Sequence, residues 1–331
     1  ENIIFILITK RMTTNKLNNS NRLHILEFLD KHFSPLNGQP QSMKVPHVTI
    51  WFWIAKCCCT TVGETVSDFF NVLFDPCQCT SKGLGFDALL FFPIFFFFLY
   101  WNFKLDYYSP FLYWGCITLC SICGTIVTDG FHDNLGLDLW IEVIIFFLLM
   151  SGTFIRWYQS EGTLDVHSIN SFRRESYYWS TVIWTFALGT AIGDCTASQW
   201  GINFAPILGF FVAIVVFILC VWIIGRSMKW IKKGDKVDVF LFWAAYIMTR
   251  PVGASTGDML GSSPANGGWG LGVGYTSLLF FVIIVAIVIG LYLSKVDVDH
   301  TLLEIAPKSA EEPNKKQEQQ QVNNNNVEMV V

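Results

Sequence analysis

Three ionisable residues, Lys56, Glu64 and Arg250, lie inside stretches of sequence that otherwise consist of apolar and small polar residues. An ionised side chain in such a stretch needs a partner, because burial removes its hydration. A carboxylate and two cationic groups can pair with one another, coordinate an ion or bind a polar solute. These residues are therefore candidates for a buried ion pair or for a solute-binding site.

Four aspartates end four copies of one motif, Trp-x9-Gly-x4-Asp. The copies are Trp53/Gly63/Asp68, Trp114/Gly124/Asp129, Trp179/Gly189/Asp194 and Trp243/Gly253/Asp258. Three residue types at two fixed spacings, four times over, indicate an internal repeat. On a helix the fifteen residues from Trp to Asp rise about 22 Å, so each copy predicts a helix with Trp toward one end and Asp at the other.

Residues four apart on a helix line one face. In each copy this stripe runs back from Asp through three such steps, and many of its positions are polar. Its polar members, besides the aspartates, are Lys56, Thr60, Glu64, Ser121, Thr125, Thr190 and Arg250. We expect the four stripes to face a common centre and to form a polar seam that ends in four carboxylates. If the fourth copy lies beside the first, Arg250 comes level with Thr60 and can pair with Glu64. Such a pair is either part of a functional site or a buried ion pair that only fixes the register of the two helices.

The segment from Thr249 through Arg250 and Pro251 to Ala254 is a further candidate. Proline within a helix removes one backbone hydrogen bond, here at the carbonyl of Ile247. Membrane transporters use interrupted helices of this kind to bind ions and substrates. The segment is therefore either a gating or binding element or an ordinary kink. For the glycines around it, close helix packing is the favoured interpretation.

Composition identifies the surroundings of these helices. Of the 331 residues, 52% are hydrophobic, 16% aromatic and only 15% charged, whereas soluble domains carry about 25% charged residues. The net charge of −4 excludes a basic nucleic-acid-binding field, and the apolar content excludes a disordered chain or a coiled coil. The composition predicts an integral membrane protein whose first partner is the lipid bilayer.

Eight segments are long enough to span a bilayer, which predicts an all-α, polytopic helical bundle. The transmembrane domain covers residues 44–293 as four parallel two-helix repeats, each a polar first helix followed by an apolar second helix. The repeats cover approximately 47–103, 109–157, 176–225 and 237–293. Residues 1–43 form a separate polar region in which 20–33 predict an amphipathic helix, and 294–331 form a Gln/Asn-rich tail predicted to be disordered.

Basic residues are distributed unevenly about the predicted spans. The N-terminal region, alternate loops and the tail hold 19 of the 22 Lys and Arg, whereas the opposite loops hold only Lys82. By the positive-inside rule both termini are expected to be cytoplasmic. The opposite face is acidic, and there Cys77 or Cys79 could form a disulfide with Cys195 if that side is oxidising.

The repeats resemble a known family. The residues that carry the likeness include Trp53, Lys56 and Thr60–Asp68 in the first copy, Thr185–Asp194 in the third and Thr249–Asp258 in the fourth. They resemble a family of uncharacterised membrane-anchored proteins, mostly bacterial, built from a repeat of unknown function. The second copy is the weakest match, with Ser121 and Cys123 in place of Thr. The resemblance implies a multi-span membrane protein and brings no substrate.

The residues favour a transporter or channel for a cation or small polar solute that passes through the polar seam. A non-catalytic membrane scaffold or sensor is the alternative, and an intramembrane enzyme is the third interpretation. The sequence contains no recognised catalytic motif, so we expect no enzymatic activity, no cofactor and no nucleic-acid partner. It leaves the metal, the oligomeric state and the membrane open.

Overall fold

The computed structural model describes residues 44–75, 82–105, 107–201 and 203–297. Within these residues it contains helices and no strand, which confirms the all-α class. The long helices are α3 (Ile50–Phe74), α4 (Lys82–Lys104), α5 (Pro110–Asp129), α6 (Leu139–Glu161), α7 (Phe172–Trp200), α8 (Phe204–Ser227), α9 (Lys236–Gly261) and α10 (Val273–Ser294). Each predicted span coincides with one of them. The predicted amphipathic helix, the residues from 298 onward, Cys77 and Cys79 lie outside the described residues.

Five of these helices, α4, α5, α6, α8 and α10, are long and apolar enough to cross a membrane by themselves. The other three, α3, α7 and α9, carry the polar motif and do not meet that criterion. They are shielded by their neighbours, because most of their residues between Trp and Asp are buried. The described chain is therefore a membrane-embedded helical bundle in which five helices are apolar enough to cross a bilayer.

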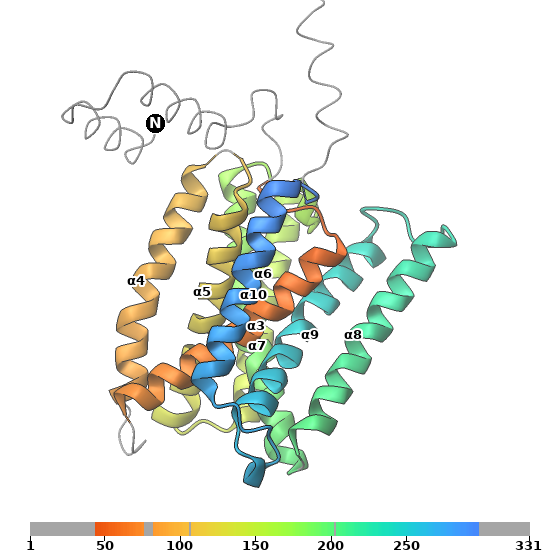
Figure 1. Ribbon diagram of the computed structural model, residues 1–331. Helices are drawn as coiled ribbons and strands as arrows, with labels where there is room; N and C mark the ends of the chain where they lie inside the picture. The colour runs from red at the N-terminus through yellow and green to blue at the C-terminus, as the bar shows by residue number, and fades with distance from the viewer. Residues whose placement is uncertain (1–43, 76–81, 106, 202, 298–331) are drawn as a thin grey trace, which may run out of the picture. The chain divides into compact units, whose positions relative to one another are not determined.

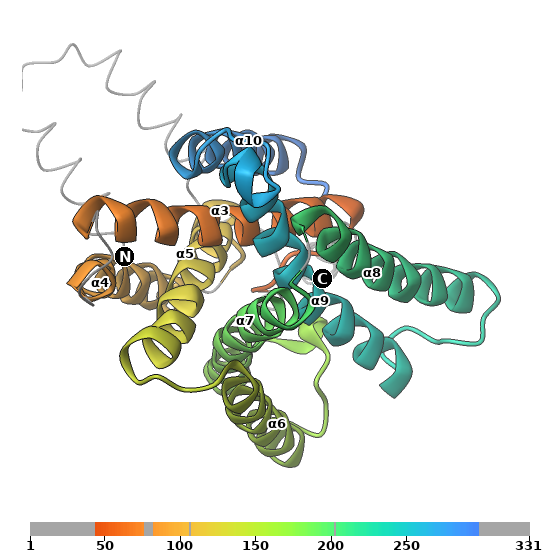
Figure 2. The same ribbon diagram turned by 90° about the horizontal axis from the view of Figure 1, so that it is seen from below.

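The four motif helices form a closed ring. Helix α3 packs on α5, α5 on α7, α7 on α9, and α9 on α3. Figure 2 shows these helices around a common centre, and in Figure 1 α3 crosses the bundle obliquely. All four run in the same direction, because an outer helix returns the chain after each. We call the two ends of this ring the Trp end and the Asp end, after the motif residues that lie there.

The outer helices join each repeat to the next one. Helix α4 packs mainly on α5, α6 on α7, and α8 on α9, while α10 returns to pack on α3. Each second helix thus covers the first helix of the following repeat, and the last repeat covers the first. In their most apolar stretches, α4, α6, α8 and α10 have only 17–28% of residues buried, against 67% in α5. This exposed surface is the apolar face that a bilayer would cover.

Aromatic side chains fill the ring at the Trp end. The motif residues Trp53, Trp114, Trp179 and Trp243 are all buried there. Outer helices add further rings: Trp222 of α8 meets Trp53, and Trp157 of α6 meets Trp243, each with ring centroids 6.0 Å apart and nearly perpendicular planes. In the first and fourth copies the repeated Trp therefore packs an inner helix against an outer one.

Candidate functional site

The predicted stripes meet inside the ring. All twelve positions located four, eight and twelve residues before the motif aspartates are buried. They are Glu64, Thr125, Thr190 and Ala254, then Thr60, Ser121, Phe186 and Arg250, then Lys56, Ile117, Val182 and Tyr246. The aspartates themselves are half-buried. The seam is therefore polar toward the Asp end and becomes mixed with apolar side chains toward the Trp end.

The motif glycine explains how the helices approach so closely. A Cβ placed on Gly63 would collide with Ser121, and one on Gly253 would collide with Thr60. A Cβ on Gly124 would lie 2.9 Å from the Cβ of Phe186, and one on Gly189 would lie 2.6 Å from the Cβ of Arg250. In every repeat the glycine thus faces the residue eight positions before Asp in the next repeat. The relation includes the step from the fourth repeat to the first, and it supports the packing interpretation of these glycines.

Arg250 and Glu64 form the buried ion pair that the sequence suggested. Nη2 of Arg250 lies 2.5 Å from Oε2 of Glu64 and donates to Oγ1 of Thr125 at 2.5 Å. The Thr125 hydroxyl also lies 3.3 Å from the same carboxylate oxygen, and Nη1 of Arg250 donates to the carbonyl of Thr60 at 3.5 Å. The side chains of Arg250 and Glu64 are 1% and 9% exposed, so solvent barely screens their attraction.

Arg250 contacts every helix of the ring. It projects from α9, pairs with Glu64 of α3, bonds Thr125 of α5 and covers Gly189 of α7. Its Nε lies buried without a hydrogen-bond partner among the described residues. The guanidinium therefore fills the centre of the seam and occludes it at this level.

On α3, Lys56 lies one helical turn before Thr60 and two turns before Glu64, and so is closer to the Trp end. Its Nζ is 3.7 Å from the ring centroid of Phe186 and 4.2 Å from that of Tyr246. The residue is 1% exposed. Aromatic faces attract a cation electrostatically, so α7 and α9 provide a partial aromatic cage for this ammonium group.

An aromatic layer closes the ring beyond Lys56. Its members, Phe52, Tyr113, Tyr178 and Phe242, each precede the motif Trp by one residue. The hydroxyls of Tyr113 and Tyr178 lie 2.5 Å apart, and the rings of Phe52 and Phe242 have centroids 6.0 Å apart. The position before the repeated Trp was not selected from the sequence, although an aromatic residue stands there in all four copies.

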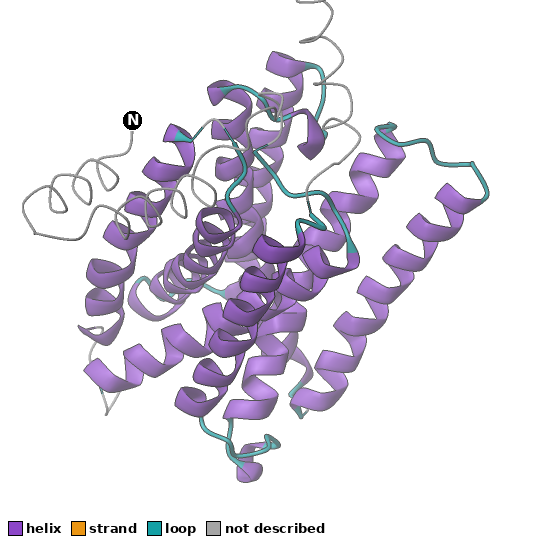
Figure 3. Cartoon of the chain, turned by 45° about the horizontal axis from the view of Figure 1, so that its top comes forward, coloured by secondary structure: helices purple, strands orange, loops and turns teal. Residues whose placement is uncertain are grey.

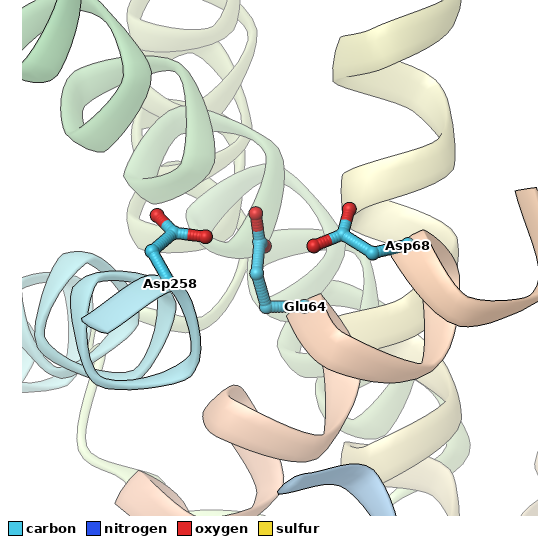
Figure 4. A group of neighbouring side chains, drawn as sticks. All are labelled: Glu64, Asp68 and Asp258. Carbon is cyan, nitrogen blue, oxygen red and sulfur yellow. The ribbon is translucent and has the colours of Figure 1, made fainter. Parts of the chain in front are cut away.

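Carboxylates converge at the Asp end. One oxygen from each of Glu64, Asp68 and Asp258 can be chosen so that all three lie within 4.8 Å of one another. Figure 4 shows Asp258 of α9 on one side of Glu64 and Asp68 of α3 on the other. We call these three residues the carboxylate cluster. Oxygen ligands at this spacing suit a hard cation. The guanidinium of Arg250 lies beside the cluster, because it pairs with Glu64.

The other two motif aspartates also belong to this electrostatic environment. Asp129 and Asp194 interact with each other, and both interact with Glu64 and Asp68. Five carboxyl groups therefore lie toward this end of the ring, and one of them, that of Glu64, pairs with the guanidinium of Arg250. The Asp end is therefore the part of the ring where acidic groups gather.

Two buried carboxylates on outer helices extend this acidic end. Glu142 of α6 and Asp87 of α4 are each 0% exposed, and their oxygens accept no hydrogen bond among the described residues. Glu142 interacts electrostatically with Asp194 and lies 3.7 Å from Nδ1 of His132. The sequence predicted an acidic face at this end but did not single out Glu142. The signal was an acidic residue in the first turn of an otherwise apolar helix.

The helix is not broken at Pro251, and the gating or binding role of the segment around it stays a prediction. Helix α9 continues from Lys236 to Gly261 with Pro251 inside it, so the segment from Thr249 to Ala254 is helical. The hydroxyls of Thr249 and Thr190 donate to carbonyls of their own helices, Tyr246 at 2.7 Å and Phe186 at 2.9 Å. The carbonyl oxygen of Ile247, which loses its usual partner at Pro251, faces Gly189 of α7, where an added Cβ would lie 3.2 Å from it. Two residues further along α9, the carbonyl of Thr249 accepts a hydrogen bond from the hydroxyl of Thr60 on α3 at 3.2 Å.

The comparison with protein families gives two matches. The family described as a repeat of unknown function (DUF347) matches residues 112–163 and 241–297. These segments correspond to α5–α6 and α9–α10, so the matched unit is one inner helix with the outer helix that follows it. The segment judged the weakest copy from the sequence is one of the two matched. We found no match among curated proteins or solved structures.

Proposed function

We propose that this membrane protein transports a cation through the polar seam of α3, α5, α7 and α9. The observation that carries the proposal is the convergence of Glu64, Asp68 and Asp258, from the first and last repeats, directly beside the buried guanidinium of Arg250. A binding site at the mouth of a closed helical ring, next to a buried ion pair, is the arrangement expected of an occluded transporter.

The carboxylate cluster favours a divalent cation. Two oxygens on opposite sides of a Ca²⁺ ion lie at most about 5 Å apart, because each Ca–O distance is about 2.3–2.6 Å. The spacing of at most 4.8 Å within the cluster satisfies this limit. A smaller ion such as Mg²⁺ or Mn²⁺ would need a modest contraction of the side chains. A bound cation would also relieve the repulsion among three neighbouring carboxylates.

Arg250 acts in this proposal as a resident cation that competes for Glu64. While Arg250 pairs with Glu64, the seam is blocked at its centre. A cation that binds Glu64 together with Asp68 and Asp258 weakens that pair, so the guanidinium can move. Lys56 and the aromatic layer form the second barrier, toward the Trp end, which the distribution of basic residues predicts to face the cytoplasm.

Uptake by proteoliposomes tests the proposal. The purified protein is reconstituted and the entry of Ca²⁺, Mn²⁺, Mg²⁺, Na⁺ and K⁺ is measured. We expect saturable uptake of at least one divalent ion, lost in the double variant Asp68→Asn/Asp258→Asn and retained in Asp138→Asn, an exposed acid at the same end. Equal uptake by protein-free vesicles and wild-type protein across the panel would contradict transport and favour the scaffold or sensor alternative.

A further inference from the structure

A long groove opens on the outer surface of the bundle between α6 and α8. The two outer helices pack on α7 and α9 respectively and make little contact with each other. Figure 2 shows α6 and α8 standing apart with α9 between them. Figure 3 shows the described chain as helices joined by loops. A strip of α9 therefore remains uncovered, and the resulting cavity measures about 1050 Å³. This volume is at the upper limit of small-molecule pockets, which measure about 300–1000 Å³.

The floor of the groove is one face of α9. Lys236, Phe240, Ala244 and Met248 follow one another at steps of four residues and all line the cavity. Twelve residues of helix rise about 18 Å. The hydrocarbon region of one leaflet is about 15 Å thick, half of the bilayer core. The groove thus runs from the Trp end to about the middle of a membrane, which is the reach of a lipid acyl chain.

The walls of the groove are apolar and its end is polar. Side chains such as Phe147 and Met150 of α6 and Ile214 and Ile218 of α8 form the walls. At the Trp end the lining changes to Tyr158, Thr163, Asp235 and Lys236. An apolar channel closed by hydroxyl and charged groups matches a molecule with a long apolar part and a polar head.

The charge around the polar end selects the head. Residues 226–238 contain five basic side chains, Arg226, Lys229, Lys232, Lys233 and Lys236, and two acidic ones, Asp235 and Asp238. The net charge of this segment is therefore +3. Asp238 already accepts two hydrogen bonds of 2.8 Å from Arg226. Its charge is therefore matched by Arg226, and the positive charge that remains comes from the lysines. Basic clusters at a helix end attract anionic lipid headgroups.

We propose that the groove between α6 and α8 binds one phospholipid with an anionic headgroup, its acyl chains along α9 and its phosphate near Lys236. The groove and the carboxylate cluster lie on different parts of α9, so the proposal is independent of cation transport. A lipid held there would fill the contact that α6 and α8 do not make with each other, and it would bridge the second and third repeats across α9 of the fourth.

Native mass spectrometry of the purified protein tests this inference. The protein is delipidated in detergent and titrated with dioleoylphosphatidylglycerol or dioleoylphosphatidylcholine. For wild type we expect one tightly bound phosphatidylglycerol and at least about threefold weaker binding of phosphatidylcholine. Lys236→Gln should remove this preference, whereas Lys233→Gln, at an exposed site in the same loop that does not line the groove, should keep it.

Filling the groove provides the second arm of the test. Ala244→Phe on the floor should reduce phosphatidylglycerol binding at least about fivefold, and Ile218→Trp on the α8 wall should do the same if Ala244→Phe impairs folding. Leu278→Phe, on the exposed face of α10, is the matched control and should bind like wild type. Undiminished binding in a folded groove-filling variant, or equal binding of the two lipids by wild type, would overturn the proposal.

Discussion

The Arg250–Glu64 pair provides a quantitative test of the ring. Both side chains are almost completely buried and bridge the last repeat to the first. Breaking a buried ion pair by removing one partner costs about 3–5 kcal/mol, because the other charge stays buried. Asp68 and Asp258 lie near enough to Glu64 to compensate Arg250 in part. We therefore expect Glu64→Gln to destabilise the fold by about 3 kcal/mol, the lower end of that range.

The double-mutant cycle isolates the interaction. Arg250→Met should cost a similar amount, about 3 kcal/mol, whereas the double variant removes both charges and should cost no more than either single variant. The coupling energy is then about 3 kcal/mol. Equilibrium unfolding in mixed detergent, followed by tryptophan fluorescence and circular dichroism, measures all four proteins.

A second ion pair serves as the control for this cycle. Arg174 and Glu161 are 2.8 Å apart with side chains 25% and 13% exposed, at a helix end. The coupling in this pair should be clearly smaller than in the central pair, as expected for an interaction that solvent screens. If the two cycles gave equal coupling, or if Glu64→Gln and Arg250→Met were additive, the central ion pair would not hold the ring together.

Two further predictions concern packing and pH. Gly253→Ala should destabilise the protein by about 1–3 kcal/mol, because the added Cβ would collide with Thr60. The control Gly152→Ala, where an added Cβ has nothing within 4 Å, should be neutral or stabilising by up to about 1 kcal/mol. Equal melting temperatures of the two variants in thermal unfolding would refute the close contact at Gly253. The hydrogen bond from His167 holds the pKa of Asp165 below its usual range, so this carboxylate contributes stability above about pH 4 that is lost as pH falls through the lowered pKa. Asp165→Asn should remove that contribution, which is less than about 1 kcal/mol for a partly exposed loop pair. The unfolding midpoint of both proteins is measured between pH 6 and pH 3. A wild-type midpoint that falls no more steeply than that of the variant would contradict the stabilising role of Asp165.

Much of the architecture follows from the sequence because the motif has fixed spacing. Helix identity, the parallel direction of the motif helices and the burial of their polar stripes all follow from Trp, Gly and Asp recurring at constant intervals on a 3.6-residue helix. The spacing also placed Arg250 level with Thr60, and that neighbourhood is confirmed by the hydrogen bond to its carbonyl.

The order of packing around the ring did not follow from the sequence. Periodicity within one helix says which face is buried and not which helix it meets, so the covering of each inner helix by the preceding repeat appeared only in the structure. The same limit explains Pro251. Its local rule predicts a broken helix, but α9 continues through Pro251 while it packs closely on α3 and α7.

Buried charges on the outer helices were also difficult to foresee. Glu142 occupies the first turn of α6, where acidic residues commonly interact with the helix dipole and solvent. Only the neighbouring ring brings it near Asp194 and removes it from water. Its part in the acidic end therefore depends on packing between repeats.

The central claim is that a cation and Arg250 compete for Glu64. The most direct measurement is the binding of Ca²⁺ and Mn²⁺ to purified wild-type protein, Arg250→Gln and Asp68→Asn/Asp258→Asn, read as the concentration-dependent rise in melting temperature that a ligand of the folded state produces. We predict that Arg250→Gln binds at least about tenfold more tightly than wild type, a difference of about 1.4 kcal/mol, and that the double aspartate variant does not bind. Unchanged or weaker binding by Arg250→Gln, or undiminished binding by the double variant, would contradict the claim.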